Sequence, residues 1–349
     1  AMPNMIINGD CRVAQRTTST ASITTGTNFV VDRWMFQPSN HGTWTLSQNS
    51  STGLAGFETS VKALCTSNGG TPAAADFVIF LYNIEGYDTQ RLKFGQSDAE
   101  RFTLSWYVKS NKTGTGVVEA QTTESTASAT VETSKTYTIS QANTWEFKSV
   151  TFPANTAHAQ ATANKTTSSG LGFRWVLDTG TNLTSGTAQT TWANQTTANR
   201  WVGQDLGIGR ADDDYMEITG VQLDIGDVAQ PFRYESFKDN LARCQRYYQI
   251  SGTARTYGIV ANQHTATTCF ANLRWWQLMR AAPTVTIGAT SAYNVYNATE
   301  NITISDIGAS QITANSCELF ATTSSRTAGT ATHMNTNGDT TFWKAESEL

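Results

Sequence analysis

Aromatic side chains within polar segments are the residues of this chain best suited to ligand chemistry. Trp192 and Trp201 bracket a polar stretch, and Tyr293 and Tyr296 lie in an Asn-rich one. A sugar ring presents an apolar C–H face that stacks on Trp or Tyr, while its hydroxyls bond to nearby amides and carboxylates. These four residues are therefore the candidate carbohydrate-binding residues. The alternative is that they cover the core from the ends of loops.

The sequence carries no familiar catalytic motif. The 4 histidines are isolated from one another, and there is no nucleophile elbow, phosphate-binding loop or dinucleotide fingerprint. We therefore expect no enzyme. Carboxylates that are distant in sequence could still meet in space as a glycosidase pair. The candidates for such a pair are Asp32, Glu58, Glu85, Asp178 and Glu217.

Charge and cysteine content exclude further classes of protein. The 349 residues have a formal net charge of −4 and Lys and Arg form no stripe, so we expect no nucleic-acid partner. No apolar run approaches the ~20 residues that cross a bilayer, so we expect no membrane insertion. The 5 cysteines lie far apart without a C-x-x-C pair, which predicts free core thiols in a protein folded in a reducing cytoplasm.

Hydrophobic alternation predicts that β-strands position most of these residues. Apolar side chains fall on every second residue in 102–109 and in 171–178, which is typical of half-buried antiparallel strands. The apolar parity switches between Ile218 and Val221, which predicts a β-bulge at Gly220.

Four tryptophans in strand patterns are expected in the core, namely Trp34, Trp106, Trp145 and Trp175. The Thr- and Asn-rich segment 179–199 is instead predicted to be a long loop. Trp192 lies in this loop, so it is less readily explained as a core residue.

The hydrophobic period becomes helical in 235–248. Phe237, Leu241, Cys244 and Tyr248 recur there at spacings of four, three and four residues, so they share one stripe of a predicted helix. So short a helix is marginal alone and must pack on a neighbouring domain or on copies of itself.

Short apolar runs after this helix predict a second all-β unit. Adjacent residues of a strand point to opposite faces, so one of Trp275 and Trp276 is expected in the core and the other at a subunit interface. The predicted oligomer-interface residues are Phe237, Leu241, Tyr248, Trp275 and Trp276.

Three groups of residues resemble motifs of bacteriophage tail-fibre and related virion proteins. They are the junction 221–232 followed by Cys244-Gln245-Arg246-Tyr247-Tyr248, the N-terminal 4–9 with Gln15-Arg16 and Asp32-Arg33-Trp34, and 279–285. The resemblance spans most of the chain. It implies a virion protein that folds in the host cytoplasm, assembles as a homotrimer and contacts other virion proteins.

The strand order of the first domain also resembles that of jelly-roll carbohydrate-binding modules. This resemblance implies a sandwich of two antiparallel sheets, often with a structural calcium near the first and last strands. Asp10 and Asp224 are the metal ligands that it implies. This chain has Thr219-Gly220 where many such modules place acidic residues, which counts against the metal, and no other cofactor is expected.

We therefore predict an all-β protein with an N-terminal antiparallel jelly-roll β-sandwich (1–232), a short connecting helix (233–250) and a C-terminal β-sandwich (251–349). The predicted function is that of a bacteriophage receptor-binding protein that adheres to host surface glycans without catalysis. The alternatives are a capsid-decorating or head-fibre structural protein and a glycan-cleaving tailspike enzyme.

Overall fold

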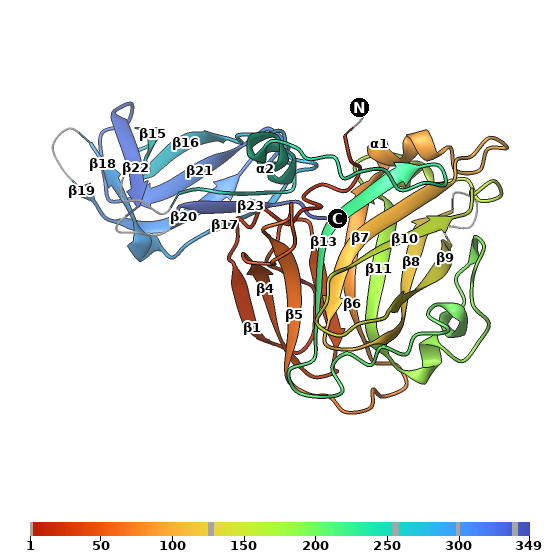
Figure 1. Ribbon diagram of the computed structural model, residues 1–349. Coiled ribbons are helices and arrows are strands. Elements are labelled where there is room, and N and C mark those ends of the chain that lie inside the picture. Colours follow the sequence, from red (N-terminus) through yellow and green to blue (C-terminus); the bar gives the residue numbers. More distant parts are fainter. Residues whose placement is uncertain (1–2, 125–128, 253–257, 298–300, 337–340) are drawn as a thin grey trace. The chain divides into compact units, whose positions relative to one another are not determined.

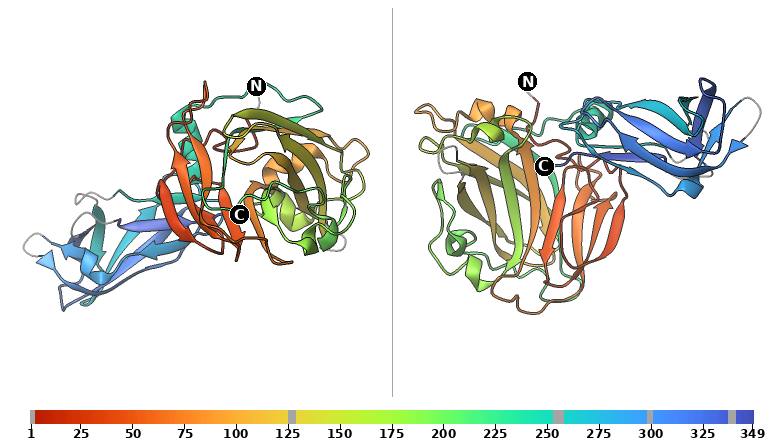
Figure 2. Two further views of the ribbon diagram at one scale, coloured as in Figure 1. Left: turned by 60° about the horizontal axis from the view of Figure 1, so that its bottom comes forward. Right: turned by 180° about the vertical axis from the view of Figure 1, so that it is seen from behind.

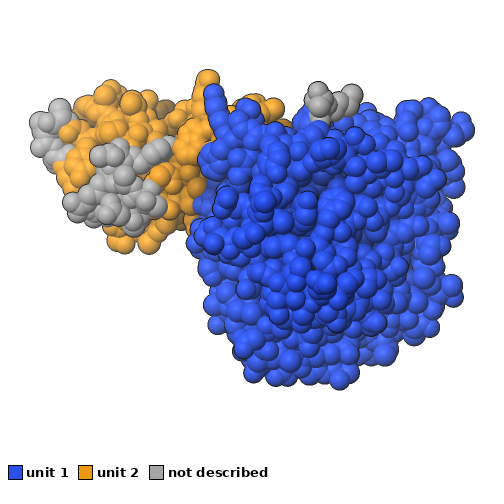
Figure 3. All heavy atoms as spheres, viewed as in Figure 1, with its two compact units in different colours: residues 1–240, 349 blue, residues 241–348 orange. Residues whose placement is uncertain are grey.

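The chain folds into two compact units of β-structure. The computed structural model describes residues 3–124, 129–252, 258–297, 301–336 and 341–349. Unit 1 comprises residues 1–240 and Leu349, and unit 2 comprises residues 241–348 (Figure 3). The division falls within helix α2 (Phe237–Gln245), inside the segment predicted as a connector. Strands dominate both units, which confirms the all-β prediction (Figure 1).

Unit 1 is an antiparallel jelly-roll β-sandwich, as predicted. Its described residues form two antiparallel sheets, whose layers can be followed in Figures 1 and 2. In order across the six-stranded sheet, the strands are β1 (Ser19–Ile23), β4 (Thr43–Asn49), β5 (Ser60–Ser67), β13 (Tyr215–Ile225), β7 (Phe102–Ser110) and β10 (Glu146–Phe152). Across the seven-stranded sheet, they are β12 (Ala193–Asn194), β9 (Thr130–Ile139), β8 (Gly114–Thr123), β11 (Ser169–Thr179), β6 (Phe77–Glu85), β3 (Met35–Ser39) and β2 (Asn28–Phe29).

The core of unit 1 lies between the two sheets and follows the predicted alternation. The alternate apolar residues of β7 and β11 are fully buried, namely Phe102, Leu104, Trp106, Val108, Leu171, Phe173, Trp175 and Leu177. Trp106 of one sheet meets Trp175 of the other edge to face, with ring centroids 6.0 Å apart. Trp34 is buried too, whereas Trp145 lies just before β10 and is only half-buried, contrary to the prediction.

The β-bulge predicted at Gly220 is present in β13. The register of β13 against β7 shifts between Thr219 and Gln222, and Gly220 has φ +61°, in the left-handed region that favours glycine. A Cβ on Gly220 would lie 2.9 Å from the Phe57 ring and 3.0 Å from the Tyr107 ring. The bulge thus brings bare backbone up against two aromatic rings on the outer face of the sheet.

The segment predicted as a long loop covers the outer face of the seven-stranded sheet. It contains η3 (Thr181–Leu183), β12 and η4 (Thr197–Asn199). Leu183 and Trp201 pack there on the side chains of β6, β8 and β11 that point away from the main core. The loop is therefore a lid with its own small apolar cluster.

Helix α2 is shorter than predicted. The hydroxyl of Ser236 accepts a hydrogen bond from the backbone N–H of Asp239 at 3.1 Å, which caps the start of the helix. The helix ends at Gln245, and Tyr248 begins strand β14 (Tyr248–Ile250), where it pairs with Glu346. The predicted helix is too long because Tyr248, a strand residue, falls on the helical stripe by its spacing alone.

Unit 2 has its own buried core. Within its described residues, the three-stranded sheet consists of β14, β23 (Trp343–Glu346) and β17 (Thr284–Ile287). The strands of the seven-stranded sheet are β19 (Asn301–Ile302), β18 (Tyr293–Tyr296), β22 (Ala331–Thr336), β15 (Gly258–Gln263), β16 (Thr268–Arg274), β21 (Ser316–Thr323) and β20 (Ile304–Ser310).

The remaining helical elements are single turns. They are α1 (Gly86–Thr89), η1 (Gln90–Leu92), η2 (Thr162–Lys165) and η5 (Thr290–Ala292). None of the described helices is long and apolar enough to cross a membrane. The five cysteines are buried free thiols, as predicted.

Candidate functional site

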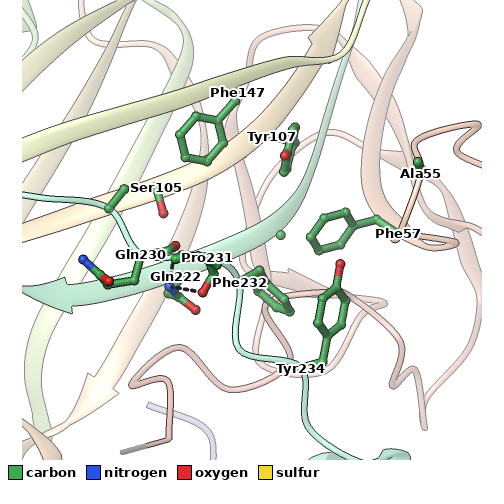
Figure 4. A pocket seen from close by; sticks show the side chains of 12 residues that line it. Ala55, Phe57, Ser105, Tyr107, Phe147, Gln222, Gln230, Pro231, Phe232 and Tyr234 are labelled. Atoms are coloured by element: carbon green, nitrogen blue, oxygen red, sulfur yellow. Dashed lines mark hydrogen bonds between the residues drawn. The ribbon is translucent and has the colours of Figure 1, made fainter. Parts of the chain in front are cut away.

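A groove lined by aromatic rings lies on the outer face of the six-stranded sheet of unit 1. Its volume is about 490 Å³. Its walls come from β7, β10 and β13, from the loop before β5 and from the segment that follows β13 (Figure 4). We call it the aromatic groove; its principal residues are Phe57, Ser105, Tyr107, Phe147, Gln222, Gln230, Pro231, Phe232 and Tyr234.

Strand alternation places the first wall of the aromatic groove. Tyr107 lies between Trp106 and Val108, which point into the sandwich, so its own side chain points outward. Phe147 of β10 is directly opposite Tyr107, and their ring centroids are 5.2 Å apart. Phe147 is 50% exposed, so one large ring on this wall is open to solvent.

The opposite wall is residues 229–234, here called the strap. Gln222 of β13 fastens the strap to the sheet. Its Nε2 donates to the carbonyl oxygens of Gln230 at 3.0 Å and of Pro231 at 3.3 Å, and its Oε1 accepts from the backbone N–H of Arg233 at 2.8 Å. Gln222 is buried, so water does not compete for these bonds.

Aromatic packing joins the strap to the loop before β5. The ring of Phe57 lies 5.0 Å from that of Phe232 and 5.3 Å from that of Tyr107. Tyr234 lies beside both Phe57 and Phe232 and is 59% exposed (Figure 4). Phe57 is therefore a buried support, and Tyr234 is a second open ring facing the groove.

The polar groups of the aromatic groove are uncharged. Among its described lining residues there is no Asp, Glu, Lys or Arg. Ser105, Gln222 and Gln230 are its polar uncharged residues, and of these three Gln230 is the exposed one. Burial, followed by the nearby Tyr107 and Asp10, raises the pKa of the Tyr234 hydroxyl, so it remains a neutral donor at physiological pH. Such a surface suits a neutral ligand that combines apolar faces with hydroxyls.

The N-terminal motif supports the aromatic groove from behind. The side chain of Asn4 donates to the carbonyl of Val221 at 2.8 Å and accepts from the N–H of Leu223 at 3.1 Å. The N–H of Val221 donates to the carbonyl of Gly9 at 2.9 Å, and a Cβ on Gly9 would lie 2.1 Å from the Val221 oxygen. Two motifs that are far apart in the sequence thus hold the bulged strand together.

The predicted calcium ligands do not fit a calcium site. Asp10 Oδ2 lies 2.5 Å from Arg12 Nε, and Asp224 Oδ1 lies 2.6 Å from Arg233 Nη1. Each carboxylate is thus already paired with a guanidinium, whose charge opposes a divalent cation. No cluster of three His, Cys, Asp or Glu that could hold a metal occurs among the described residues. Asp224 instead helps to anchor the strap, because it also accepts from the N–H of Gln230 at 3.0 Å.

The four predicted carbohydrate-binding residues lie outside the aromatic groove. Trp192 and Trp201 are 8% and 1% exposed, Tyr293 is 2% exposed, and Tyr296 is half-buried in β18. Trp192 packs on Phe94 with ring centroids 5.5 Å apart. The ring faces of Trp192, Trp201 and Tyr293 are covered by protein, which corrects the expectation that they are open to a ligand.

Trp201 covers a buried group of charges that we call the carboxylate cluster, comprising Glu119, Glu132, Arg174 and Arg200. Nε and Nη2 of Arg200 each lie 3.0 Å from the Glu119 carboxylate, and Trp201 Nε1 donates to it at 3.3 Å. Arg174 Nε lies 3.7 Å from Oε2 of Glu119. Both glutamates are at most 1% exposed, so no substrate reaches them in this structure.

The pKa values of the two glutamates in the carboxylate cluster are shifted in opposite directions. Burial alone would raise the pKa of Glu119, but Arg174 and Arg200 outweigh burial and lower it. Burial and the neighbouring Glu119 raise the pKa of Glu132. Oε1 of Glu132 is buried without a donor among the described residues, so a proton on it would donate to Glu119.

The carboxylates that the sequence suggests for a glycosidase pair are mostly structural, and Glu119 and Glu132 are not among them. Asp178 pairs with Arg210 at 2.7 Å, and Glu217 pairs with Lys62 at 3.5 Å. Asp32 and Glu85 are buried, and Glu58 is exposed.

The predicted oligomer-interface residues divide into two groups. Phe237 and Trp276 are 52% and 47% exposed. Tyr248 and Trp275 are buried and Leu241 is half-buried. The expectation that one of the two adjacent tryptophans lies in the core is confirmed, although both follow β16 rather than lie in it.

The rings of the aromatic groove are not among the predicted binding residues, because those four residues all come from polar segments. A signal was nevertheless present. Tyr107 is a large aromatic residue at the solvent parity of β7, whose other parity is apolar, and a small or polar side chain is usual at such a position.

No family model matches this chain, and no curated protein matches it. Solved structures of carbohydrate-binding modules are similar to it. TmCBM61 in complex with β-1,4-galactotriose matches at 8% identity and a TM-score of 0.27, covering 64% of this chain and 99% of that one. The family 11 module from Clostridium thermocellum in complex with a β-1,3-1,4-mixed-linked tetrasaccharide matches at 9% identity and a TM-score of 0.29. The match covers 61% of this chain and 99% of that one. Likeness at this level says nothing of what this chain binds.

Proposed function

We propose that unit 1 is a non-catalytic glycan-binding module and that the aromatic groove is its binding site. The observation that carries the proposal is the pairing of two open rings, Phe147 and Tyr234, with the exposed, uncharged amide of Gln230 in one groove. Sugar C–H faces stack on the rings, and sugar hydroxyls bond to the Gln230 amide and the Tyr234 hydroxyl. The polar strap bonds hold the rings in place before the ligand arrives, which lowers the entropic cost of binding.

A glycan array of bacterial surface polysaccharides tests this proposal. The wild-type protein is compared with Phe147→Ala and with the control Tyr87→Ala, which removes a 56% exposed ring that does not line the groove. We expect Phe147→Ala to weaken binding about fivefold to tenfold and Tyr87→Ala to leave it unchanged.

Three results would count against the proposal: no glycan bound, equal binding by the Phe147 variant, or equal loss in both variants. A reducing-sugar assay on each bound glycan addresses the enzymatic alternative. Product release that depends on the protein would replace adhesion by cleavage.

We further propose that the whole chain is a homotrimeric bacteriophage virion component that attaches to host glycans alongside other virion proteins. The sequence motifs support this proposal, as do the large exposed side chains Phe237 and Trp276, which suit a subunit contact. Light scattering tests it: we expect a mass near three times 37.9 kDa, lowered by Trp276→Ser. A monomeric wild-type protein would contradict the trimer. A trimer that binds no glycan would favour the capsid-decoration alternative.

A further inference from the structure

The outer face of the six-stranded sheet continues beyond the aromatic groove. Lys109 lies two residues after Tyr107 on the same face of β7, about 7 Å farther along the strand. Trp145 lies two residues before Phe147, and the Lys109 ammonium is 5.9 Å from the centroid of its ring. A cation and an indole thus adjoin the open end of the groove.

Trp145 is firmly joined to the groove wall. Its Nε1 donates to the carbonyl of Thr52 at 3.0 Å, and the Thr52 hydroxyl donates to the carbonyl of Phe57. Thr52 is buried, so this connection is shielded from water. The indole and the Phe57 side of the aromatic groove therefore form one rigid surface.

The charge of Lys109 is not balanced by the protein. Lys109 is half-buried and forms no ion pair with a carboxylate of the described chain. Glu217 lies opposite it on β13, but the Glu217 carboxylate is bound by Lys62 at 3.5 Å and by Ser60 and Asn49 at 2.9 Å each. The neighbouring Lys112 is itself paired with a carboxylate, so of these two lysines Lys109 is the one left for an external anion.

We propose that Lys109 and Trp145 form a second subsite that takes a sugar residue bearing a carboxylate, next to a neutral residue in the aromatic groove. This inference rests on the proposed glycan binding. The ammonium pairs with the carboxylate, and the ring of Trp145 packs on the same sugar. The preferred glycan is then a mixed polymer of neutral and acidic residues.

Calorimetric titration with matched glycans tests the second subsite. The probes are hexasaccharides of hyaluronan, alginate and polygalacturonate, together with acidic fragments that bind on the array. Each is used native and after carboxyl reduction, which turns the carboxylate into a neutral hydroxymethyl group. The proteins are wild type, Lys109→Gln, Lys109→Arg and the control Lys165→Gln, which removes an exposed charge that does not line the groove.

We expect an acidic fragment to bind wild type about tenfold more tightly than its reduced form, and Lys109→Gln to abolish that difference. Lys109→Arg should retain most of the difference in affinity between the native and the reduced fragment, and Lys165→Gln should retain all of it. Equal binding of native and reduced forms, equal weakening of both by Lys109→Gln, or binding of neutral glycans alone would overturn the second subsite. If Phe147→Ala still weakens binding in those cases, the proposed function survives. Absence of all glycan binding would defeat both.

Discussion

The two outer faces of the sandwich in unit 1 both carry aromatic and polar residues, but one face is open to solvent and the other is covered. The face of the six-stranded sheet carries Phe147 and Tyr234, both at least half exposed, over an uncharged floor. The face of the seven-stranded sheet carries Glu119, Glu132 and Arg174, which are covered by the segment that contains Arg200 and Trp201. The difference shows that the covering loop, and not the presence of aromatic and polar residues, decides which face can meet a ligand.

The covered face should contribute most to stability, and Arg200→Met tests this directly. Its loss leaves the buried Glu119 with Arg174 as its remaining guanidinium, 3.7 Å away. We expect the free energy of unfolding to fall by about 3–5 kcal/mol, measured by guanidinium chloride denaturation. Arg274→Met, at an exposed position of unit 2, is the control. A loss below about 1 kcal/mol, or a simultaneous loss of glycan binding, would remove the contrast between the faces.

Glu132→Gln should change how stability depends on pH. Burial and Glu119 raise the pKa of Glu132 from 4.5 to about 9. Between these values the folded state keeps a proton that the unfolded chain releases, so the contribution of Glu132 to wild-type stability falls as pH rises from about 5 to about 9. Between about pH 5 and about pH 8.5 we expect the free energy of unfolding of the variant to fall less than that of wild type, by on the order of 2 kcal/mol. Denaturation at about pH 5, 7 and 8.5 measures this difference. Parallel curves for the two proteins would show that Glu132 is ionised in the folded state.

On the open face, Gly220→Ala should affect stability and binding together. The backbone at position 220 is left-handed, a conformation that is strained for alanine. The new methyl group would also press on the rings of Phe57 and Tyr107. We expect a loss of about 1–2 kcal/mol in stability and a severalfold loss of glycan affinity. Gly226→Ala is a matched control, because Gly226 also has a positive φ, +100°, but nothing lies within 4 Å of its added Cβ. If both variants lose affinity equally, backbone strain and not the ring contact is responsible.

The smallest effect is expected from Tyr234→Phe. The substitution keeps the open ring and removes only the hydroxyl, so stability should stay within about 0.5 kcal/mol of wild type. Glycan affinity should fall about threefold through the loss of one hydrogen bond. Titration calorimetry measures both binding and its enthalpy. Unchanged affinity would assign the role of Tyr234 to ring stacking alone.

The strands of unit 1 could be predicted because their burial is periodic. The apolar parity of β7 and β11 was read correctly, and the parity switch located the bulge at Gly220. The burial of Trp192 and Trp201 could not be predicted, since no periodic pattern reveals where a long loop packs on the sheets. The helix was extended to Tyr248 because a strand residue fell by chance on the helical stripe.

The aromatic groove was harder to predict because it depends on contacts across the sequence. The junction 221–232 stood out as a motif, yet its role as a groove wall follows from Gln222 and Asp224 binding the strap back onto the sheet. Phe57 reaches the same site from a loop more than 150 residues earlier, as the numbering shows. Hydrophobic periodicity carries no information on such encounters.

The strap is also the stretch of chain that leads out of the sandwich toward helix α2. Any pull on the chain beyond residue 234, with a glycan held in the groove, acts on the wall that holds the glycan. Gln222 and Asp224 of the sheet, together with Arg233 of the strap, then serve as a mechanical anchor, because the bonds between sheet and strap must break before the wall can separate. The lifetime of an attachment under load would thus be set by these three side chains as much as by the rings that touch the sugar.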